Sequence, residues 1–198
     1  MKLMRPVGLV CAALLVLSGC GLEAIPGVTC GPGNCTGCCQ DGVCQAGTAW
    51  EACGSGGSTC GTCANHQSCL AQACAMDQNQ FWILTPVSAV ITPTNNGTSW
   101  DDFGGAEPDP IVLVGNEKTP ELTNTLTPGW NVGFRLAAWE LMSGVTIQMQ
   151  DVDDLTGNDP ITPAEIFQFT EAHFQQGSAR IQNWGAVQSI DFALTRAQ

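Results

Sequence analysis

The stretch VTIQMQDVDDLTGNDP, residues 145–160, decides how the second half of this chain folds. Apolar and polar residues alternate from Val145 to Gln150, which is the pattern of a β-strand with one buried face. The strand runs directly into a loop that carries Asp151, Asp153 and Asp159 and contains no Lys or Arg. The sequence therefore predicts a half-buried strand that ends in an acidic turn.

The surrounding residues have the pattern of an all-β domain. Short apolar or alternating runs are separated by turns rich in Gly, Pro, Asn and Asp, as in an antiparallel β-sandwich. We expect strands at 81–91, 111–114, 122–126, 132–138, 145–150, 161–169 and 190–195. Residues 163–169 are equally compatible with one turn of helix.

A second group of acidic residues lies upstream, at Asp101, Asp102 and Asp109. Calcium takes six to eight oxygen ligands at about 2.3–2.6 Å in a loose geometry, so two separate turns can supply them. No His or Cys accompanies these acids, which favours calcium over zinc, and magnesium demands a stricter octahedral geometry. The alternative is that each Asp caps its own turn by accepting a local backbone N–H.

The order of several motifs resembles that of a C2 domain. These motifs are WDDFGGAEPDPIVLV at 100–114, TPGWNVGF at 127–134, DVD at 151–153 and DPI at 159–161, and the resemblance covers about residues 81–197. It implies an eight-stranded antiparallel β-sandwich with calcium loops at one end. Residues 95–99, NNGTS, depart from the family pattern, because many members carry another acid or a longer apolar tip there.

The resemblance also implies a set of metal ligands and a role for them. Asp109 and either Asp101 or Asp102 match the acids of one loop. Asp151, Asp153 and Asp159 match those of the other. In C2 relatives, calcium mediates contact with phospholipid head groups or stabilises the fold for a protein contact. The usual basic surface for phosphoinositides is missing here, since Lys118, Arg135, Arg180 and Arg196 are scattered.

The first twenty residues predict export and lipid anchoring. Lys2 and Arg5 precede an apolar run that is too short to cross a bilayer but has the length of an export signal. The segment LSGC at 17–20 resembles the bacterial lipoprotein processing box, which implies cleavage before Cys20 and lipidation of that residue. Gly21 favours the outer membrane in Gram-negative families. The alternative is an ordinary signal peptide that contains a Cys.

Ten of the 12 cysteines fall within 30–74, which predicts a disulfide-rich module with five bridges. They are Cys30, Cys35, Cys38, Cys39, Cys44, Cys53, Cys60, Cys63, Cys69 and Cys74. The two Cys-x-x-Cys pairs also fit a zinc ribbon, but an oxidising compartment favours disulfides. We expect Trp50 to be the apolar packing centre of this module and His66 to be a solvated turn residue.

The expected organisation is a signal peptide at 1–19, a lipidated linker at 20–29, the Cys-rich module at 30–76 and the sandwich at 77–198. Removing Lys2 and Arg5 leaves four basic against 18 acidic residues, a formal charge of −14. Such a chain lacks the clustered Lys and Arg that nucleic-acid binding requires. Acidity also serves solubility, but it does not explain why the acids are bunched.

The sequence predicts no catalytic site. It contains no Gly-x-Ser-x-Gly elbow, no His-Glu-x-x-His helix and no phosphate loop, and His173 has no evident catalytic partner. We therefore expect a non-enzymatic, lipid-anchored envelope protein that binds calcium for adhesion or for docking to a membrane or protein. The alternative is an interaction or inhibitor-like function in the Cys-rich module, with the sandwich as scaffold.

Overall fold

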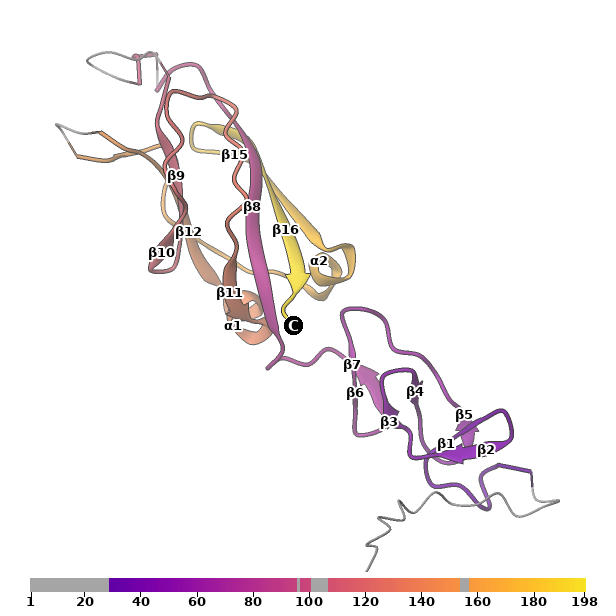
Figure 1. Cartoon of the computed structure of the whole chain (residues 1–198). Helices are drawn as coiled ribbons and strands as arrows, with labels where there is room; N and C mark the ends of the chain where they lie inside the picture. Colours follow the sequence, from indigo (N-terminus) through magenta and orange to yellow (C-terminus); the bar gives the residue numbers. More distant parts are fainter. Residues whose placement is uncertain (1–28, 96, 101–106, 154–156) are drawn as a thin grey trace, which may run out of the picture.

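A computed structural model describes residues 29–95, 97–100, 107–153 and 157–198. Its described residues form a small Cys-rich module followed by a larger β-sandwich (Figure 1). The expected calcium residues Asp101 and Asp102 and the lipidation residue Cys20 lie outside the described residues.

The Cys-rich module is held together by five disulfides that use all ten of its cysteines. The pairs are Cys30–Cys39, Cys35–Cys44, Cys38–Cys60, Cys53–Cys69 and Cys63–Cys74. Its strands are β1 (Cys38–Gln40), β2 (Val43–Gln45), β3 (Thr48–Ala49), β4 (Ala52–Cys53), β5 (Ser58–Thr59), β6 (Ser68–Leu70) and β7 (Ala73–Ala75). The predicted disulfide framework is confirmed.

Cysteines, and not an aromatic residue, occupy the centre of this module. Cys35, Cys38, Cys53 and Cys63 are buried, whereas Trp50 is 36% exposed, so the expectation that Trp50 forms the packing centre is wrong. So small a segment has too few large apolar residues to enclose an indole, and cross-links replace the missing core.

The sandwich has two antiparallel sheets, which confirms the predicted fold class. One sheet has the order β11-β8-β16-β15, and the other has β10-β9-β12 with β13 and β14 both on the free edge of β12. The elements are β8 (Phe81–Ile91), β9 (Pro110–Val114), β10 (Glu117–Lys118), β11 (Phe134–Ala137), α1 (Ala138–Ser143), β12 (Val145–Asp151), β13 (Asp159–Pro160), β14 (Glu165–Phe167), α2 (Glu171–Gln176), β15 (Ser178–Trp184) and β16 (Val187–Arg196). The two short edge pieces together fill one position, so each sheet has four strand positions and the sandwich has eight.

A bulge splits the edge strand where the sequence predicts one strand at 161–169. The N–H groups of Ile161 and Thr162 both donate to the carbonyl of Met149, and the Thr162 hydroxyl accepts the Met149 N–H at 2.8 Å. Two residues therefore oppose one, which interrupts the ladder. Residues 165–167 then resume pairing as β14, which decides between strand and helix in favour of a short strand.

The expected strand at 122–126 is wrong, because this segment crosses between the two sheets. The N–H groups of Leu122 and Thr125 donate to the carbonyls of Pro110, which begins β9, and of Pro108 just before it, while the carbonyl of Leu126 accepts the Ile91 N–H of β8. Backbone bonds to two different sheets satisfy polar groups of the segment without forming a ladder.

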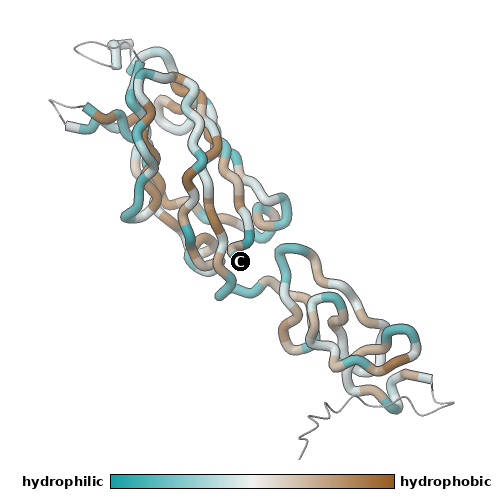
Figure 2. Tube along the Cα trace, in the orientation of Figure 1, coloured by the Kyte–Doolittle hydropathy of each residue, from teal (hydrophilic) through white to brown (hydrophobic). Residues whose placement is uncertain are grey.

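The core lies between the sheets and is made of inward-facing side chains. Leu84 of β8, Ile147 of β12 and Phe192 of β16 are fully buried in it. Along the strands in Figure 2, hydrophobic and hydrophilic residues alternate, as the two-residue period of a strand requires.

Polar contacts attach the Cys-rich module to the end of the sandwich where β8 begins. The Arg196 guanidinium donates to the carbonyl of Gln67, to the Ser68 hydroxyl and to the side-chain oxygen of Gln80. His66 is only 9% exposed, and its Nε2 lies 3.2 Å from Oε1 of Glu171 on α2. The expectation that His66 is solvated is wrong, because the sandwich covers this turn.

Candidate cation site

The alternation of β12 places an acid in a row of buried apolar residues. Val145, Ile147 and Met149 face the core, and Asp151 is the next residue on the same face. Its exposed fraction is 0%. Burying a carboxylate is costly unless hydrogen bonds or an opposite charge compensate it. The end of β12 is therefore the place in the sandwich where such compensation is needed most.

Asp151 connects the end of β12 to the start of β9. Its Oδ1 accepts the backbone N–H of Asp109 at 2.6 Å, and the carbonyl of Asp109 accepts the N–H of Val152 at 3.1 Å. These bonds extend the β9–β12 pairing by one residue beyond the Asp151↔Pro110 partners. One acid of each predicted loop thus takes part in the same connection.

Asp109 fixes a third segment. Its Oδ1 accepts the backbone N–H of Asn124, which has a positive φ of 49°. Asp109 and Asp151 therefore each hold a backbone N–H of a segment distant in the sequence, which differs from the local turn capping of the alternative. This task uses Oδ1 of each carboxylate and is compatible with a ligand role, because a carboxylate has two oxygens and about four acceptor sites.

The register brings the two predicted loops together. Asp151 stands opposite Asp159 of β13 on one side and opposite Pro110, next to Asp109, on the other. Directly opposed residues of antiparallel strands share a face, so Asp159 lies beside Asp151, and Asp159 is exposed. Asp153 follows two residues after Asp151 in the same loop. We call Asp109, Asp151 and Asp159 the acid row.

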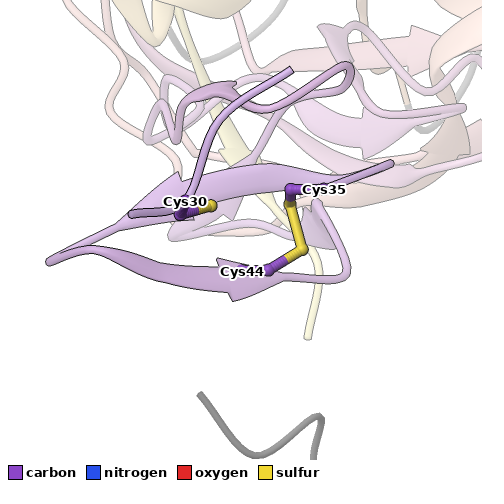
Figure 3. A group of neighbouring side chains, drawn as sticks. All are labelled: Cys30, Cys35 and Cys44. Carbon is purple, nitrogen blue, oxygen red and sulfur yellow. A yellow bond between two sulfur atoms is a disulfide. The ribbon is translucent and has the colours of Figure 1, made fainter. Parts of the chain in front are cut away.

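The tight clusters of potential metal ligands among the described residues consist of cysteines. Their ligand atoms lie within 4.8 Å of one another in two groups, Cys30 with Cys35 and Cys44, and Cys53 with Cys63 and Cys74. Figure 3 shows Cys30 beside the Cys35–Cys44 disulfide. Every sulfur in both groups belongs to a disulfide, so none is a free thiolate for zinc. Within the described part of the chain, no three carboxylates bring their oxygens within this distance of one another, so the structure does not gather the acid row into a formed metal site.

Sequence reasoning missed two features near the end of β12. Oε1 of Gln150 accepts the side-chain N–H of Asn158 at 3.1 Å, on the face of β12 opposite to Asp151. An open hollow of about 610 Å³ also lies beside β13 and is lined by Thr92, Thr94, Asn95, 160–163, Gly185 and Ala186. The alternation of residues 148–150 was the only sequence signal for the Gln150–Asn158 contact. No sequence pattern indicates the hollow beside β13.

The two histidines make contacts with neighbouring elements. His66 contacts Glu171 at the module junction, and Nδ1 of His173 accepts the backbone N–H of Thr170 at the start of α2. Both imidazoles therefore hold local structure. No helix within the described residues is long and apolar enough to cross a membrane.

Comparison with known proteins finds no matching protein family and no matching curated protein. The solved structures that resemble the chain include C2 domains. A C2 domain of plant extended synaptotagmin 1 aligns with a TM-score of 0.42 and 10% identity, over 62% of this chain and 98% of that one. A structure described as a C2 domain aligns with a TM-score of 0.40 and 15% identity, over 59% and 98%.

A third similar structure is a calcium-bound pair of C2 domains from extended synaptotagmin 2. Its TM-score is 0.41 and its identity 13%, over 61% of this chain and 47% of that one. Since these scores lie below 0.5, the strand pairing of the chain itself defines its fold.

Replacing Asp151 tests its structural role. Asp151→Ala leaves the Asp109 N–H without this acceptor, so we expect the free energy of unfolding to fall by about 1–3 kcal/mol in calcium-free urea denaturation. Asp151→Asn retains a side-chain acceptor and is expected to lose less. The exposed Asp159→Ala serves as the control, with an expected change within about 0.5 kcal/mol. Equal losses for the two alanine variants would show that Asp151 has no special structural role.

Proposed function

We propose that the β-sandwich binds calcium at the end where β12 terminates. The ligands are Asp109, Asp151, Asp153 and Asp159, with Asp101 or Asp102 from the preceding loop. The observation that carries the proposal is the fully buried carboxylate of Asp151, which stands opposite Asp159 of β13 and accepts the backbone N–H of Asp109. Oxygen-only ligands of this kind suit a hard divalent cation.

The distribution of basic residues supports neutralisation of the acid row by a metal ion from solution. After residue 19 the chain has only Lys118 and three arginines. Arg135 lies over the Phe81 ring, Arg180 lies 3.5 Å from Asp191, and Arg196 holds the Cys-rich module. All three arginines are thus engaged outside the acid row. A bound divalent ion would bring these carboxylates together and would remove the repulsion between them.

Calcium would supply positive charge and open coordination positions at this end of the sandwich. The protein residues would hold the ion, and phosphate of a phospholipid head group or a carboxylate of a protein partner would complete its shell. Solvent-accessible sites of this type have dissociation constants on the order of 10⁻⁴–10⁻³ M, which suits an extracellular module. The proposed role is therefore non-enzymatic docking or adhesion.

Thermal unfolding tests the calcium proposal. At calcium about ten times the dissociation constant, binding to the native state alone adds roughly 1.4 kcal/mol, which raises Tm by about 5 °C. The double variant Asp151→Asn with Asp153→Asn is expected to lose this rise. Glu165→Gln, which removes a charge on β14 opposite Ile147 of β12, is expected to retain the rise. No calcium-dependent rise in the unmodified protein would exclude the proposal.

We also propose that the protein is a lipoprotein of the cell envelope, anchored through Cys20 and located in the outer membrane. The support is the sequence at 1–21 together with the complete set of disulfides, which form in oxidising compartments. A lipid anchor would keep the sandwich next to a membrane, where calcium-dependent docking has most effect.

The anchor is tested by replacing Cys20 with Ser. Without the acceptor sulfur the chain cannot be lipidated, so we expect it to leave the membrane fraction and to lose metabolic labelling with palmitate. Cys11→Ser, inside the apolar run, is the matched control and is expected to keep both properties. Labelling that persists in the Cys20 variant would contradict lipidation at this residue.

The Cys-rich module is a second candidate for function. Val43, Trp50 and Leu70 are each exposed by 36–40%, and a module with so few large apolar residues has little other reason to show three at its surface. This function would be an interaction with another protein. It predicts that Trp50→Ala weakens partner binding and leaves the calcium-dependent rise in Tm unchanged.

A further inference from the structure

A second hollow, of about 440 Å³, lies at the end of the sandwich opposite to the acid row. It is formed where the β9–β10 turn, α1 and the start of β12 meet (Figure 1). Its lining includes Glu117, Leu136, Trp139, Glu140, Gly144 and Thr146. We call it the α1 groove. The calcium proposal uses none of these residues.

Trp139 is the main apolar group of the α1 groove. It is 49% exposed, although Ala138 and Leu141 on either side of it in α1 are buried. The position of the helix is fixed: Oε2 of Glu140 accepts the Ala137 N–H at 2.7 Å, and the Trp139 N–H donates to the carbonyl of Gln78 at 2.9 Å. The indole is therefore held at the surface by a rigid support, as in a preformed binding site.

The apolar surface continues from the groove onto β14. Ile166 is 70% exposed and stands opposite Thr146, which lines the groove. Gly144 lies between α1 and this strand, where a Cβ would come within 2.5 Å of the Ile166 side chain. Glycine at 144 thus lets Ile166 lie against the groove. Trp139 and Ile166 together offer an exposed apolar strip.

The charge of the α1 groove is negative. Glu117 and Glu140 both line it, and no Lys or Arg is among its lining residues. Lys118 is the next residue on β10 but does not line the groove. An aromatic face with two carboxylates beside it attracts a cation that also has an apolar stem, which describes arginine and lysine side chains.

The same chemistry already occurs within this chain. The guanidinium of Arg135 lies 3.6 Å from the ring centroid of Phe81 on the outer side of the β8–β11 pair. Trp139 is a stronger cation acceptor than Phe, and within the described residues no Lys or Arg lies over its ring. After residue 19 a second copy of this protein offers Lys118 and three arginines, of which the arginines are engaged in the contacts described above. Lys118 follows Glu117 directly on β10, so self-association is the competing occupant of the groove.

We propose that the α1 groove docks a basic segment of a partner protein, with an arginine or lysine side chain over Trp139 and within reach of Glu117 and Glu140. An apolar neighbour of that basic residue would contact Ile166. The α1 groove lies at the start of β12, whereas the acid row lies at its end. A calcium-bound sandwich can therefore hold a membrane or acidic partner at one end and a basic partner at the other.

Peptide titration calorimetry on the purified protein tests this proposal. The probe is an amidated pentapeptide of alternating arginine and leucine, and the matched peptide carries glutamine in place of arginine. Trp139→Ala is expected to weaken binding of the arginine peptide roughly 3- to 30-fold, the range that a cation–π contact supplies. Glu117→Gln is expected to weaken it about twofold to fivefold. The glutamine peptide is expected to show no saturable binding.

Two control variants distinguish binding in the groove from non-specific attraction of the basic peptide to an acidic protein. Val87→Ala trims an exposed apolar side chain on β8 outside the groove, and Glu121→Gln removes an exposed charge outside the groove. Both are expected to change the affinity by less than twofold. Since Trp139→Ala leaves the net charge unchanged, a loss in this variant alone supports the proposal. Equal affinities for Trp139→Ala and the unmodified protein, or equal losses for Glu117→Gln and Glu121→Gln, would overturn it.

Sedimentation of the same samples tests whether a second copy of this protein occupies the α1 groove. If Trp139→Ala converts a dimer into a monomer, the groove is a self-association surface and the proposal of a basic partner is wrong. If both proteins are monomers at the titration concentration, the peptide result applies to the groove itself.

Discussion

The register of β12 is the constraint on which the sandwich depends. This strand is paired on both edges, with β9 on one side and with β13 and β14 on the other. Double pairing fixes which residues face the core, because a slip of one residue would turn Ile147 and Met149 outward. The same register carries Asp151 into the buried row and sets Asp109 and Asp159 beside it. The register of β12 therefore determines both the packing of the core and the position of the acid row.

A buried acid at the end of a core strand links stability to function. Asp151 closes the β9–β12 pairing by accepting the Asp109 N–H, and Asp109 in turn holds Asn124. These bonds give the carboxylates a structural task even without a metal ion. In the proposed calcium site they would also hold the first oxygens in place, so that an arriving ion would have to order less of the loop. These structural bonds and the proposed calcium binding are therefore compatible.

Strong local patterns made part of this structure predictable. The alternation at 145–150 and the apolar run at 81–91 identified β12 and β8, and the cysteine spacing indicated bridges. Features that depend on distant contacts were not predictable. Residues 122–126 have the composition of a strand but bond to two sheets, and His66 is buried only because α2 covers it. The disulfide pairing needs the folded path of the chain, and the convergence of Asp109 with Asp151 needs the register.

Calorimetric titration of the purified protein with calcium tests the central claim most directly, because it measures the acid row itself without a membrane or partner. The account predicts saturable binding with a dissociation constant on the order of 10⁻⁴–10⁻³ M, and a clear loss of affinity in Asp151→Asn, which keeps the shape of the side chain but removes its charge. Absence of saturable heat at calcium concentrations well above that range, in a protein shown to be folded, would contradict it.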